Sequence, residues 1–277
     1  MPGEEDRRRD TVTLAAMDLG LRERVCLVTG STGGIGLETA RLLADEGGRV
    51  VVCGRDAGRV ERARREAGAE VGLVYDLAEP GAPAALVAEV ASMLGDVRCL
   101  VNNVGIAYQV HFEDVTDSQW DEMWQLNVMS YVRAIQAALP AMRDGRGGVI
   151  VNVSSTAGKR PSTGMPNYSV TKAAVLSLSR LVADLYARDG VRCNAVAPGP
   201  TATDAWLGKG GLAEQQAAVS GKTKEEVLEA VAKGRPLGRL AEPYEIAAVV
   251  AFLCSERARY VTGAAWSADG GTVPIII

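Results

Sequence analysis

Short apolar runs alternate with amphipathic segments along most of the chain. Apolar runs of strand length occupy residues 24–30, 48–53, 71–75, 97–101, 149–153, 191–197 and 264–268. Apolar residues recur at helical spacing over residues 37–46, 82–94, 117–142, 166–188 and 242–254, which predicts helices there. Strands that alternate with helices across short turns form an open parallel sheet covered on both faces. We therefore predict an α/β protein with one doubly wound parallel sheet of about seven strands and helices on both faces.

Residues 23–277 are predicted to form a single domain, because no second pattern and no internal repeat interrupts this alternation. Residues 1–22 contain clustered charges and no long apolar core. We interpret them as a flexible N-terminal extension rather than a signal or transit peptide. No stretch reaches the roughly 18 consecutive apolar residues of a transmembrane helix, so no membrane partner is expected.

Composition narrows the functional classes. The net charge of −4 argues against a nucleic-acid partner, which would require a basic excess. The five cysteines include no Cys-x-x-Cys pair, and we interpret them as small buried residues in a reducing compartment, which predicts a cytoplasmic protein. His111 is the only histidine. A His-based metal site and a Ser-His-Asp triad are therefore disfavoured, and no metal is expected.

A glycine-rich turn follows the first apolar run. Residues 29–36 read Thr-Gly-Ser-Thr-Gly-Gly-Ile-Gly and lead into an amphipathic helix. A strand, a glycine-rich turn and a helix predict a dinucleotide-binding site of the Rossmann type, because the glycines admit the pyrophosphate and the helix N-terminus offers free amides. The candidate cofactor contacts in this turn are Gly30, Thr32, Gly34, Ile35 and Gly36.

The end of the second run bears on the choice between NADP and NAD. In dinucleotide-binding proteins a carboxylate at this point bonds the ribose 2′-hydroxyl, whereas a guanidinium matches a 2′-phosphate. Arg55 stands there, and the first carboxylate follows at Asp56. We therefore predict NADP as the preferred cofactor, with NAD possible. The alternative interpretation is that Arg55 is a solvated loop residue.

Other strand ends carry further candidate contacts. A carboxylate and an amide after the third run could bond the adenine edge or serve only as a strand-end cap. Asparagine amides after the fourth run can tie neighbouring strands, and a glycine there permits close approach to a cofactor. The Pro-Gly-Pro-Thr-Ala-Thr turn of residues 198–203 lies where a nicotinamide amide needs partners. The candidate contacts are Asp76, Leu77, Asn103, Gly105, Pro198, Gly199, Thr201 and Thr203.

Tyr168 and Lys172 have the spacing that places two side chains on one helix face. A nearby cation favours the phenolate and lowers the pKa of a tyrosine from its usual value near ~10. Ser155 lies thirteen residues before Tyr168, at the end of the fifth apolar run. The intervening loop and the helix start at Pro166 would bring the hydroxyl beside the phenol.

The segment from residue 205 to residue 236 is weakly apolar and contains several Gly, Lys and Glu residues. We predict that it forms a mobile lid or part of the substrate cleft. The side chains that favour an apolar, bulky substrate are Val110, His111, Phe112, Trp206 and Leu207. The substrate itself does not follow from the sequence.

Over residues 20–273 the chain resembles the short-chain dehydrogenase/reductase family. The resemblance rests on residues 29–36, Asp76-Leu77, residues 102–105, Asn127, Ser155, Tyr168, Lys172, Pro198-Gly199 and residues 268–271. It implies that Tyr168 is the acid/base and that Ser155 holds the substrate oxygen. Lys172 would bond the nicotinamide ribose and lower the pKa of Tyr168, and Asn127 would position a water that relays protons to Lys172.

The resemblance also implies that Thr201 and Thr203 contact the nicotinamide carboxamide and the pyrophosphate. It implies a homo-oligomer, a tetramer or a dimer, with contacts through the two long helices and the last strand. Val104 departs from the family pattern, in which alanine is usual. Gly33 occupies a position where NADP-dependent members often carry a basic residue, which weakens the NADP prediction.

The reactive serine remains ambiguous between Ser154 and Ser155, although the spacing to Tyr168 favours Ser155. The implied activity is NAD(P)-dependent hydride transfer between nicotinamide and a small ketone or secondary alcohol. A rival is a 3-oxoacyl-carrier-protein reductase of fatty-acid or polyketide type. It would need a basic patch near the cleft, for which the candidates, diluted by Asp144 and Asp189, are Arg143, Arg146, Lys159 and Arg160. A rival of another class is a catalytically silent cofactor-sensing protein.

Overall fold

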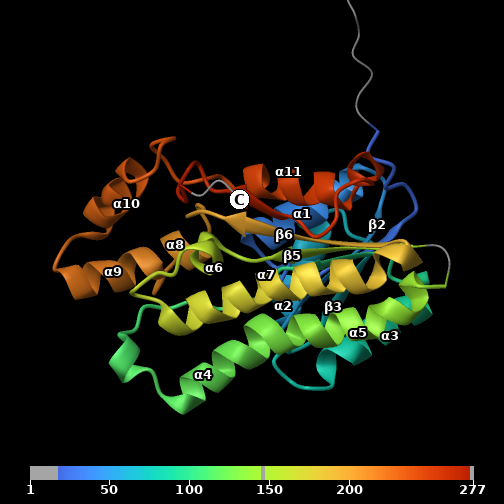
Figure 1. The fold of residues 1–277 in the computed structure, drawn as a ribbon, viewed down its shortest axis with the longest axis horizontal. Coiled ribbons are helices and arrows are strands. Elements are labelled where there is room, and N and C mark those ends of the chain that lie inside the picture. The colour runs from blue at the N-terminus through green and yellow to red at the C-terminus, as the bar shows by residue number, and fades with distance from the viewer. Residues whose placement is uncertain (1–17, 145–146, 275–277) are drawn as a thin grey trace, which may run out of the picture.

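The computed structural model describes residues 18–144 and 147–274. Seven strands form one sheet in the order β3-β2-β1-β4-β5-β6-β7 (Figure 1), and every neighbouring pair is parallel. The predicted doubly wound sheet is confirmed. The strands are β1 (Val25–Val28), β2 (Arg49–Gly54), β3 (Val71–Val74), β4 (Cys99–Asn102), β5 (Gly148–Val153), β6 (Val191–Pro198) and β7 (Ala265–Ala268).

Helices cover both faces of the sheet. Figure 1 shows α1 (Gly34–Asp45) and α11 (Pro243–Cys254) above the strands and α5 (Ser130–Met142) and α7 (Pro166–Tyr186) below them. The face of α5 and α7 also carries α3 (Ala82–Leu94), whereas α2 (Ala57–Glu66) follows β2. The strand order reverses between β1 and β4, and ligands bind outside the carboxyl ends of strands at such a reversal.

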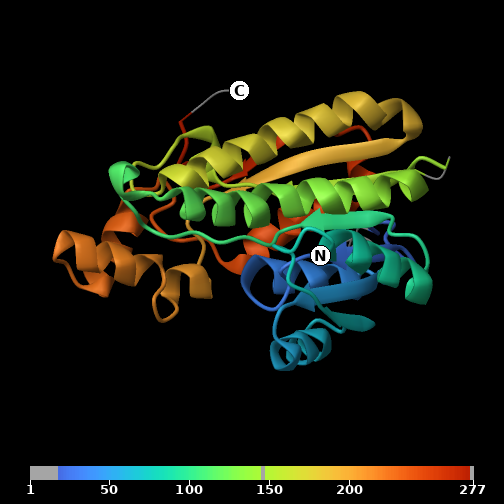
Figure 2. The same cartoon turned by 90° about the horizontal axis from the view of Figure 1, so that it is seen from below.

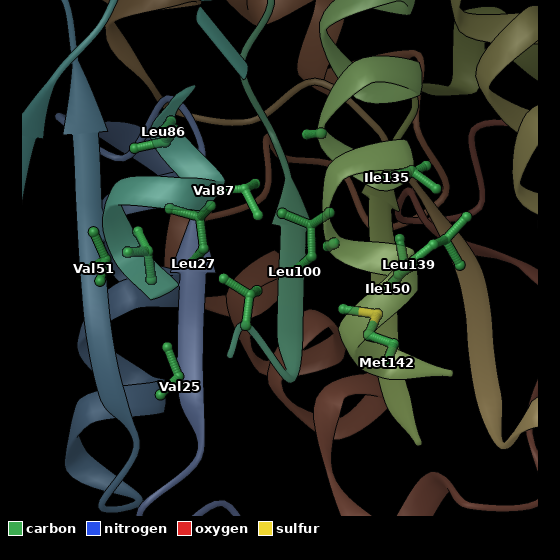
Figure 3. Close-up of a cluster of buried hydrophobic side chains, with 14 of the residues drawn as sticks. Val25, Leu27, Val51, Leu86, Val87, Leu100, Ile135, Leu139, Met142 and Ile150 are labelled. Carbon is green, nitrogen blue, oxygen red and sulfur yellow. The ribbon is translucent and has the colours of Figure 1, made fainter. Parts of the chain in front are cut away.

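Successive strand residues face two different cores. Leu27 packs on the side of α3 and α5, whereas Val28 packs on the side of α1 and α11. In Figure 3, Leu27 of β1 lies near Leu86 and Val87 of α3, whereas Ile150 of β5 lies near Leu139 and Met142 of α5. Because both faces of the sheet are buried, the strands form continuous apolar runs rather than alternating ones.

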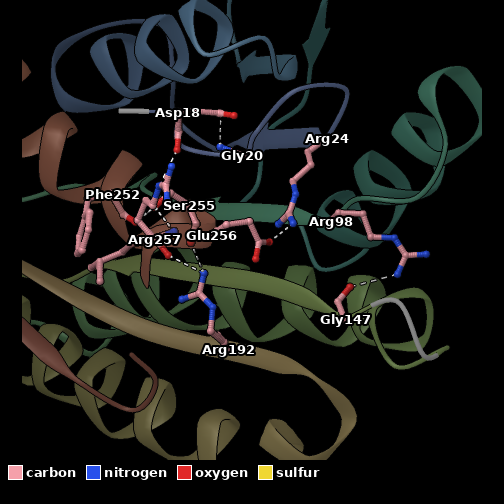
Figure 4. A network of polar contacts seen from close by, with 11 residues as sticks. Asp18, Gly20, Arg24, Arg98, Gly147, Arg192, Phe252, Ser255, Glu256 and Arg257 are labelled. Atoms are coloured by element: carbon pink, nitrogen blue, oxygen red, sulfur yellow. Dashed lines mark hydrogen bonds and ion pairs between the residues drawn. The ribbon is translucent and has the colours of Figure 1, made fainter. Parts of the chain in front are cut away.

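The packed part of the chain begins earlier than the predicted boundary at residue 23. Leu21 is fully buried. Glu256 donates its backbone N–H to the carbonyl of Leu19, and the Arg257 Nε donates a 2.8 Å hydrogen bond to the carbonyl of Asp18 (Figure 4). Residues 18–22 therefore belong to the packed domain, and the rest of the predicted extension lies outside the described residues.

The predicted helix over 117–142 is interrupted by a π-helical turn. The structure has α4 (Asp117–Trp124), then η2 (Gln125–Met129) and then α5. Inside the turn, the side-chain oxygen of Asn127 accepts a 2.9 Å hydrogen bond from the Ile106 backbone N–H. The side-chain amide of Asn127 donates a 3.0 Å hydrogen bond to the Ile106 carbonyl. A π-turn adds a residue to the helix, and here it presents the Asn127 amide to the loop after β4.

The segment over 205–236 folds into short helices that lie beyond one end of the sheet (Figure 2). They are α8 (Asp204–Leu207), α9 (Leu212–Ser220) and α10 (Lys224–Lys233). Ala213, Val227 and Val231 form a small core of their own, with Trp206 packed against it. The shorter elements elsewhere are η1 (Phe112–Asp114), α6 (Thr156–Lys159), η3 (Ala187–Asp189) and η4 (Glu256–Ala258).

All five cysteines are buried and unpaired, which confirms their prediction as small core residues. Among the described residues, no helix combines the length and the apolar character that crossing a membrane requires.

Candidate active site

A cavity of about 1070 Å³ opens at the carboxyl edge of the sheet. This volume exceeds that of a typical drug-sized site, so it has room for a dinucleotide together with a small substrate. The structure brings most of the predicted site residues to its wall: Gly30, Thr32, Gly34, Ile35, Arg55, Asp76, Leu77, Asn103, Gly105, Ser155, Tyr168, Lys172, Pro198, Gly199, Thr201 and Thr203. Two predicted residues, Gly36 and Asn127, do not line it.

The glycine-rich turn lines the cavity with backbone that a phosphate group can approach closely. Gly34 has a φ of 55°, in the left-handed region that favours glycine, and a Cβ there would lie 2.9 Å from the Thr203 Cγ2. The first turn of α1 has no side-chain cap, so its amides and the helix dipole face the cavity. A Cβ on Gly36 would meet the Asn103 amide and the Gly30 carbonyl at 2.5 Å, so this position requires glycine for close packing, and its contact with a cofactor stays a prediction.

Two guanidinium groups stand where a ribose phosphate would be expected. The Arg55 side chain is 70% exposed and forms a loose ion pair, 3.7 Å, with Asp76. Arg59 also lines the cavity, and a Cβ on Gly33 would lie 3.7 Å from its Nη2. Arg59 therefore places a basic group beside position 33, where the sequence has glycine. The sequence alone did not predict this residue.

The signal that could have found Arg59 is its place in a helix. Asp56 caps α2, because its side chain accepts 2.7 Å from the Arg59 backbone N–H. A residue three positions after a cap lies in the first helical turn. Since α2 begins directly after β2, that turn adjoins the carboxyl edge of the sheet.

Two asparagine side chains at the end of β4 form hydrogen bonds to the glycine-rich turn and to the neighbouring strand β5. The Asn103 amide donates 3.1 and 3.0 Å hydrogen bonds to the carbonyls of Thr29 and Gly30. The Asn102 amide donates 2.9 Å to the Asn152 side-chain oxygen, which joins β4 to β5. The predicted tie between neighbouring strands is confirmed.

The structure separates the two adjacent serines. Ser154 is buried, and its hydroxyl donates a 2.7 Å hydrogen bond to the Lys172 carbonyl. Ser155 lines the cavity, caps the short helix α6 and shares a hydrogen bond with Tyr168. The hydroxyl available to a ligand beside Tyr168 is therefore that of Ser155, as the spacing predicted.

Tyr168 and Lys172 lie one turn apart near the start of α7. The Lys172 Nζ donates a 2.8 Å hydrogen bond to the Val153 carbonyl and lies 5.7 Å from the centre of the Tyr168 ring. Lys172 is 3% exposed, and its burial lowers the pKa of its ammonium to about 7. Burial raises the pKa of Tyr168, and the hydrogen bond with Ser155 opposes that rise. In the chain alone the pKa of Tyr168 is therefore raised by burial rather than lowered as expected, and the phenol is protonated at neutral pH.

The buried ammonium of Lys172 predicts a pH dependence of stability. Between pH 7 and the usual lysine pKa of about 10.4, the unfolded chain binds a proton that the folded chain releases. Stability relative to Lys172→Met should therefore rise with pH across this window, by up to about 5 kcal/mol at roughly 1.4 kcal/mol per pKa unit. Urea unfolding at several pH values measures the difference. The exposed Lys222→Met serves as the control, and equal slopes for both variants would contradict the prediction.

The chain is similar to known proteins in both sequence and structure. A family model described as enoyl-(acyl carrier protein) reductase matches residues 30–273. A solved structure described as a short chain dehydrogenase/reductase family protein is 37% identical, with a TM-score of 0.78, and the match covers 92% of this chain and 99% of that one. The chain belongs to the short-chain dehydrogenase/reductase family. It is therefore an oxidoreductase that acts on alcohol and carbonyl groups.

Two other members of the family show the range of this similarity. The chain is 36% identical over 253 residues to a cis-4-hydroxycyclohexanecarboxylate dehydrogenase from Sinomonas cyclohexanicum, with 90% of this chain and 96% of that enzyme covered. The crystal structure of L-sorbose reductase from Gluconobacter frateurii, complexed with NADPH and L-sorbose, is 34% identical. It has a TM-score of 0.87, and the match covers 94% of this chain and 100% of that chain.

Asn127 differs from the other predicted catalytic residues of this family member. It is fully buried and does not line the cavity. Its amide donates to Ile106 and, at 3.3 Å, to the Thr171 hydroxyl. A Cβ on Gly105 would lie 3.0 Å from the Asn127 Oδ1 and 3.6 Å from the Lys172 Nζ. Asn127 therefore fixes the loop beside Lys172, and its role in a water relay stays a prediction.

Of the five side chains that favoured an apolar, bulky substrate, the structure brings one to the cavity. Trp206 lines it, whereas Val110, His111, Phe112 and Leu207 do not. The segment over 205–236 does form part of the cleft, as predicted. We call one group of cavity residues the substrate-end wall: Arg160, Met165, Asp204, Trp206, Leu212, Gln216, Val231 and Arg235.

The basic patch needed by a carrier-protein reductase is not assembled. Arg143 follows α5 and pairs with Asp189, which precedes β6, so both lie at the edge where strands begin. Lys159 donates its ammonium hydrogens to the Ala265 carbonyl and the Ser267 hydroxyl. Arg160 alone of the described candidates lines the cavity. Arg146 lies outside the described residues.

Proposed function

We propose that this family member transfers a hydride between NADP and a small ketone or secondary alcohol. The observation that carries the proposal is the shared cavity. The glycine-rich turn, the two arginines after β2 and the cluster of Ser155, Tyr168 and Lys172 all face it. One ligand can therefore bridge the phosphate-binding end and the acid/base end.

The chemistry divides between cofactor and protein. A reduced nicotinamide cofactor supplies the hydride that adds to the carbonyl carbon. The Ser155 hydroxyl donates a hydrogen bond to the carbonyl oxygen and holds it beside Tyr168. The protonated phenol of Tyr168 donates its proton to that oxygen as the C=O bond becomes C–OH. In the oxidising direction Tyr168 accepts the same proton, and a protonated Lys172 stabilises the phenolate.

The cofactor preference rests on the two guanidinium groups. A ribose 2′-phosphate would accept hydrogen bonds from Arg55 and Arg59, and the pyrophosphate would lie over the uncapped start of α1. The similar L-sorbose reductase is described as complexed with NADPH, which supports the same assignment. NAD, which lacks the phosphate, would offer no anion to either guanidinium and would leave Arg55 with its loose ion pair to Asp76.

Hydride transfer tests the proposal directly. The purified protein is mixed with NADPH or NADH and a panel of ketones, and with the oxidised cofactors and the matching alcohols. We expect ketone-dependent loss of the reduced-cofactor absorbance, faster with NADPH, and one alcohol formed per cofactor oxidised. No reaction in either direction with either cofactor would contradict the proposal and leave the cofactor-sensing alternative.

A carrier-protein substrate is the weaker alternative, because the basic candidates do not gather at the cavity. A carrier-bound 3-oxoacyl group and its free analogue should therefore react at similar rates. A large preference for the carrier-bound group would revive the alternative. The known relatives include enzymes named for a carboxylate and for a neutral sugar, so similarity leaves the charge of the substrate open.

We infer further that the protein is a cytoplasmic homo-oligomer, a dimer or a tetramer. Its free cysteines fit a reducing compartment. Large apolar side chains stay exposed on the outer faces of α4, α7 and α11 and on β7, and such patches mark protein contacts. These side chains are Trp124, Val170, Leu181, Leu185, Tyr244 and Trp266. Light scattering of the purified protein measures the state.

A further inference from the structure

Arg235 lines the substrate end of the cavity and has no carboxylate partner among the described residues. It follows α10, and its Nη1 donates a 2.6 Å hydrogen bond to the Val231 carbonyl. Its Nε is buried and has no acceptor. Within residues 18–144 and 147–274 it forms no ion pair with a carboxylate. A guanidinium that lines a cavity and has no carboxylate to pair with points to an anionic ligand.

The nearby carboxylates are committed to other donors. Arg235 also borders a second cavity of about 360 Å³, together with Glu245 and Asp269. Glu245 binds Arg239 through both oxygens, at 2.6 and 2.7 Å. Asp269 accepts a 3.0 Å hydrogen bond from each of the backbone amides of Gly271 and Val273. Neither acid is available to neutralise Arg235.

The other charged groups on this wall leave the positive charge in place. Arg160, after α6, also lines the substrate end, and it forms no ion pair in the described chain. Asp204, at the start of α8, lines the same cavity without pairing with either arginine. The substrate end therefore carries two guanidinium groups against one carboxylate.

We propose that Arg235 binds the carboxylate of the substrate, so that the enzyme acts on oxo acids and the matching hydroxy acids. A guanidinium presents parallel N–H donors that match the two oxygens of a carboxylate. The Nε is buried and one hydrogen of Nη1 is held by the Val231 carbonyl, so the end of the guanidinium formed by Nη1 and Nη2 is the part that remains for the ligand. The carbonyl to be reduced lies at Ser155 and Tyr168, and the carboxylate at Arg235 orients it there. This inference rests on the proposed hydride transfer.

A cofactor phosphate is the competing acceptor, and the fold argues against it. Arg55, Arg59 and the start of α1 already serve the phosphate end, near β2. Arg235 comes after α10, on the wall formed with Trp206 and Val231. A substitution of Arg235 should therefore leave NADPH affinity unchanged, whereas a phosphate contact would weaken it.

The experiment compares acids with their neutral esters. The probes are 3-oxobutanoate, 4-oxopentanoate and 4-oxocyclohexanecarboxylate, each beside its methyl ester, with NADPH. For the natural protein we expect kcat/KM for at least one acid to exceed that for its ester by about 30- to 100-fold, since each hydrogen bond to a charged group contributes roughly 1.5–3 kcal/mol. Arg235→Met should remove this preference mainly through KM, and Arg235→Lys should restore part of it.

Binding measurements keep the inference testable if turnover fails. Calorimetric titration of each acid and ester into the NADPH-bound protein should show tighter acid binding, which is lost in Arg235→Met. Lys222→Met, exposed and outside the cavity, is the matched control for removing one charge. Equal affinity of acids and esters, an unchanged acid preference in Arg235→Met or weakened NADPH binding would overturn the inference. Acid binding without hydride transfer would instead overturn the proposed function alone.

Discussion

Replacing Tyr168 by Phe is expected to lower kcat/KM by about 10²- to 10⁴-fold, the contribution of a positioned acid/base group. The ring remains, so the packing around Ser155 and Lys172 is retained, but no proton can pass to the substrate oxygen. NADPH affinity should change by less than about twofold, because the phosphate-binding turn and both arginines are untouched. A single-turnover measurement of hydride transfer separates this loss from any change in product release.

The control for this variant is Tyr260→Phe, which removes a hydroxyl from a fully exposed tyrosine. It should retain the activity of the natural protein. A Tyr168→Phe enzyme with undiminished single-turnover hydride transfer would sink the acid/base assignment. A loss of NADPH binding in the same variant would mean that the phenol also supports the cofactor site, and the fall in kcat/KM would then need to be divided between the two effects.

The raised pKa of Tyr168 has a consequence for the direction of the reaction. A protonated phenol is the form that donates to a carbonyl, so the chain alone is prepared for reduction at neutral pH. Oxidation needs the phenolate, which burial disfavours. A positive charge close to Tyr168 would oppose that effect, and Lys172 with a pKa of about 7 supplies only part of it at neutral pH.

The sheet could be predicted because each of its strands is marked by a short run of apolar residues in the sequence. Parallel strands buried on both faces must be apolar along their whole length, and each turn after such a run lies at the same edge of the sheet. Gly34, Arg55, Asp76 and Ser155 were therefore placed together from the sequence alone. Where the edge rule sufficed, the predicted residues line the cavity.

The features that the sequence did not predict are the surroundings of Asn127 and the places of Arg59 and Arg235, and they have a different physical origin. Asn127 lies in a π-turn, which depends on a hydrogen bond to Ile106 rather than on helical spacing. Arg59 is brought to Gly33 by the first turn of α2. Arg235 is recognised as a candidate ligand contact only when the carboxylates near it are known to be paired elsewhere. Each of these features depends on which groups meet in space, and residue periodicity does not contain that information.

The pair Arg55 and Arg59 carries the second large prediction. The double variant Arg55→Ala and Arg59→Ala should weaken NADPH binding by about 10²- to 10³-fold, while each single change weakens it by about tenfold. Charge-assisted hydrogen bonds to phosphate contribute roughly 1.5–3 kcal/mol each, and the exposure of Arg55 places its share at the low end. NADH affinity should change by less than about threefold, because NADH lacks the 2′-phosphate.

Fluorescence titration at one fixed salt concentration measures both affinities, and added salt should weaken NADPH binding more than NADH binding. Arg62→Ala is the matched control, since Arg62 lies on α2, is exposed and does not line the cavity. Asp76 pairs loosely with Arg55, so the free protein must give up that contact when a phosphate binds. If the natural protein bound NADH more tightly than NADPH, Asp76 would be the dominant partner of Arg55 and the enzyme would be an NAD-dependent dehydrogenase. If only the Arg59 change weakened NADPH binding, the phosphate would be held by the helix α2 side alone, and Arg55 would be the solvated loop residue of the alternative interpretation.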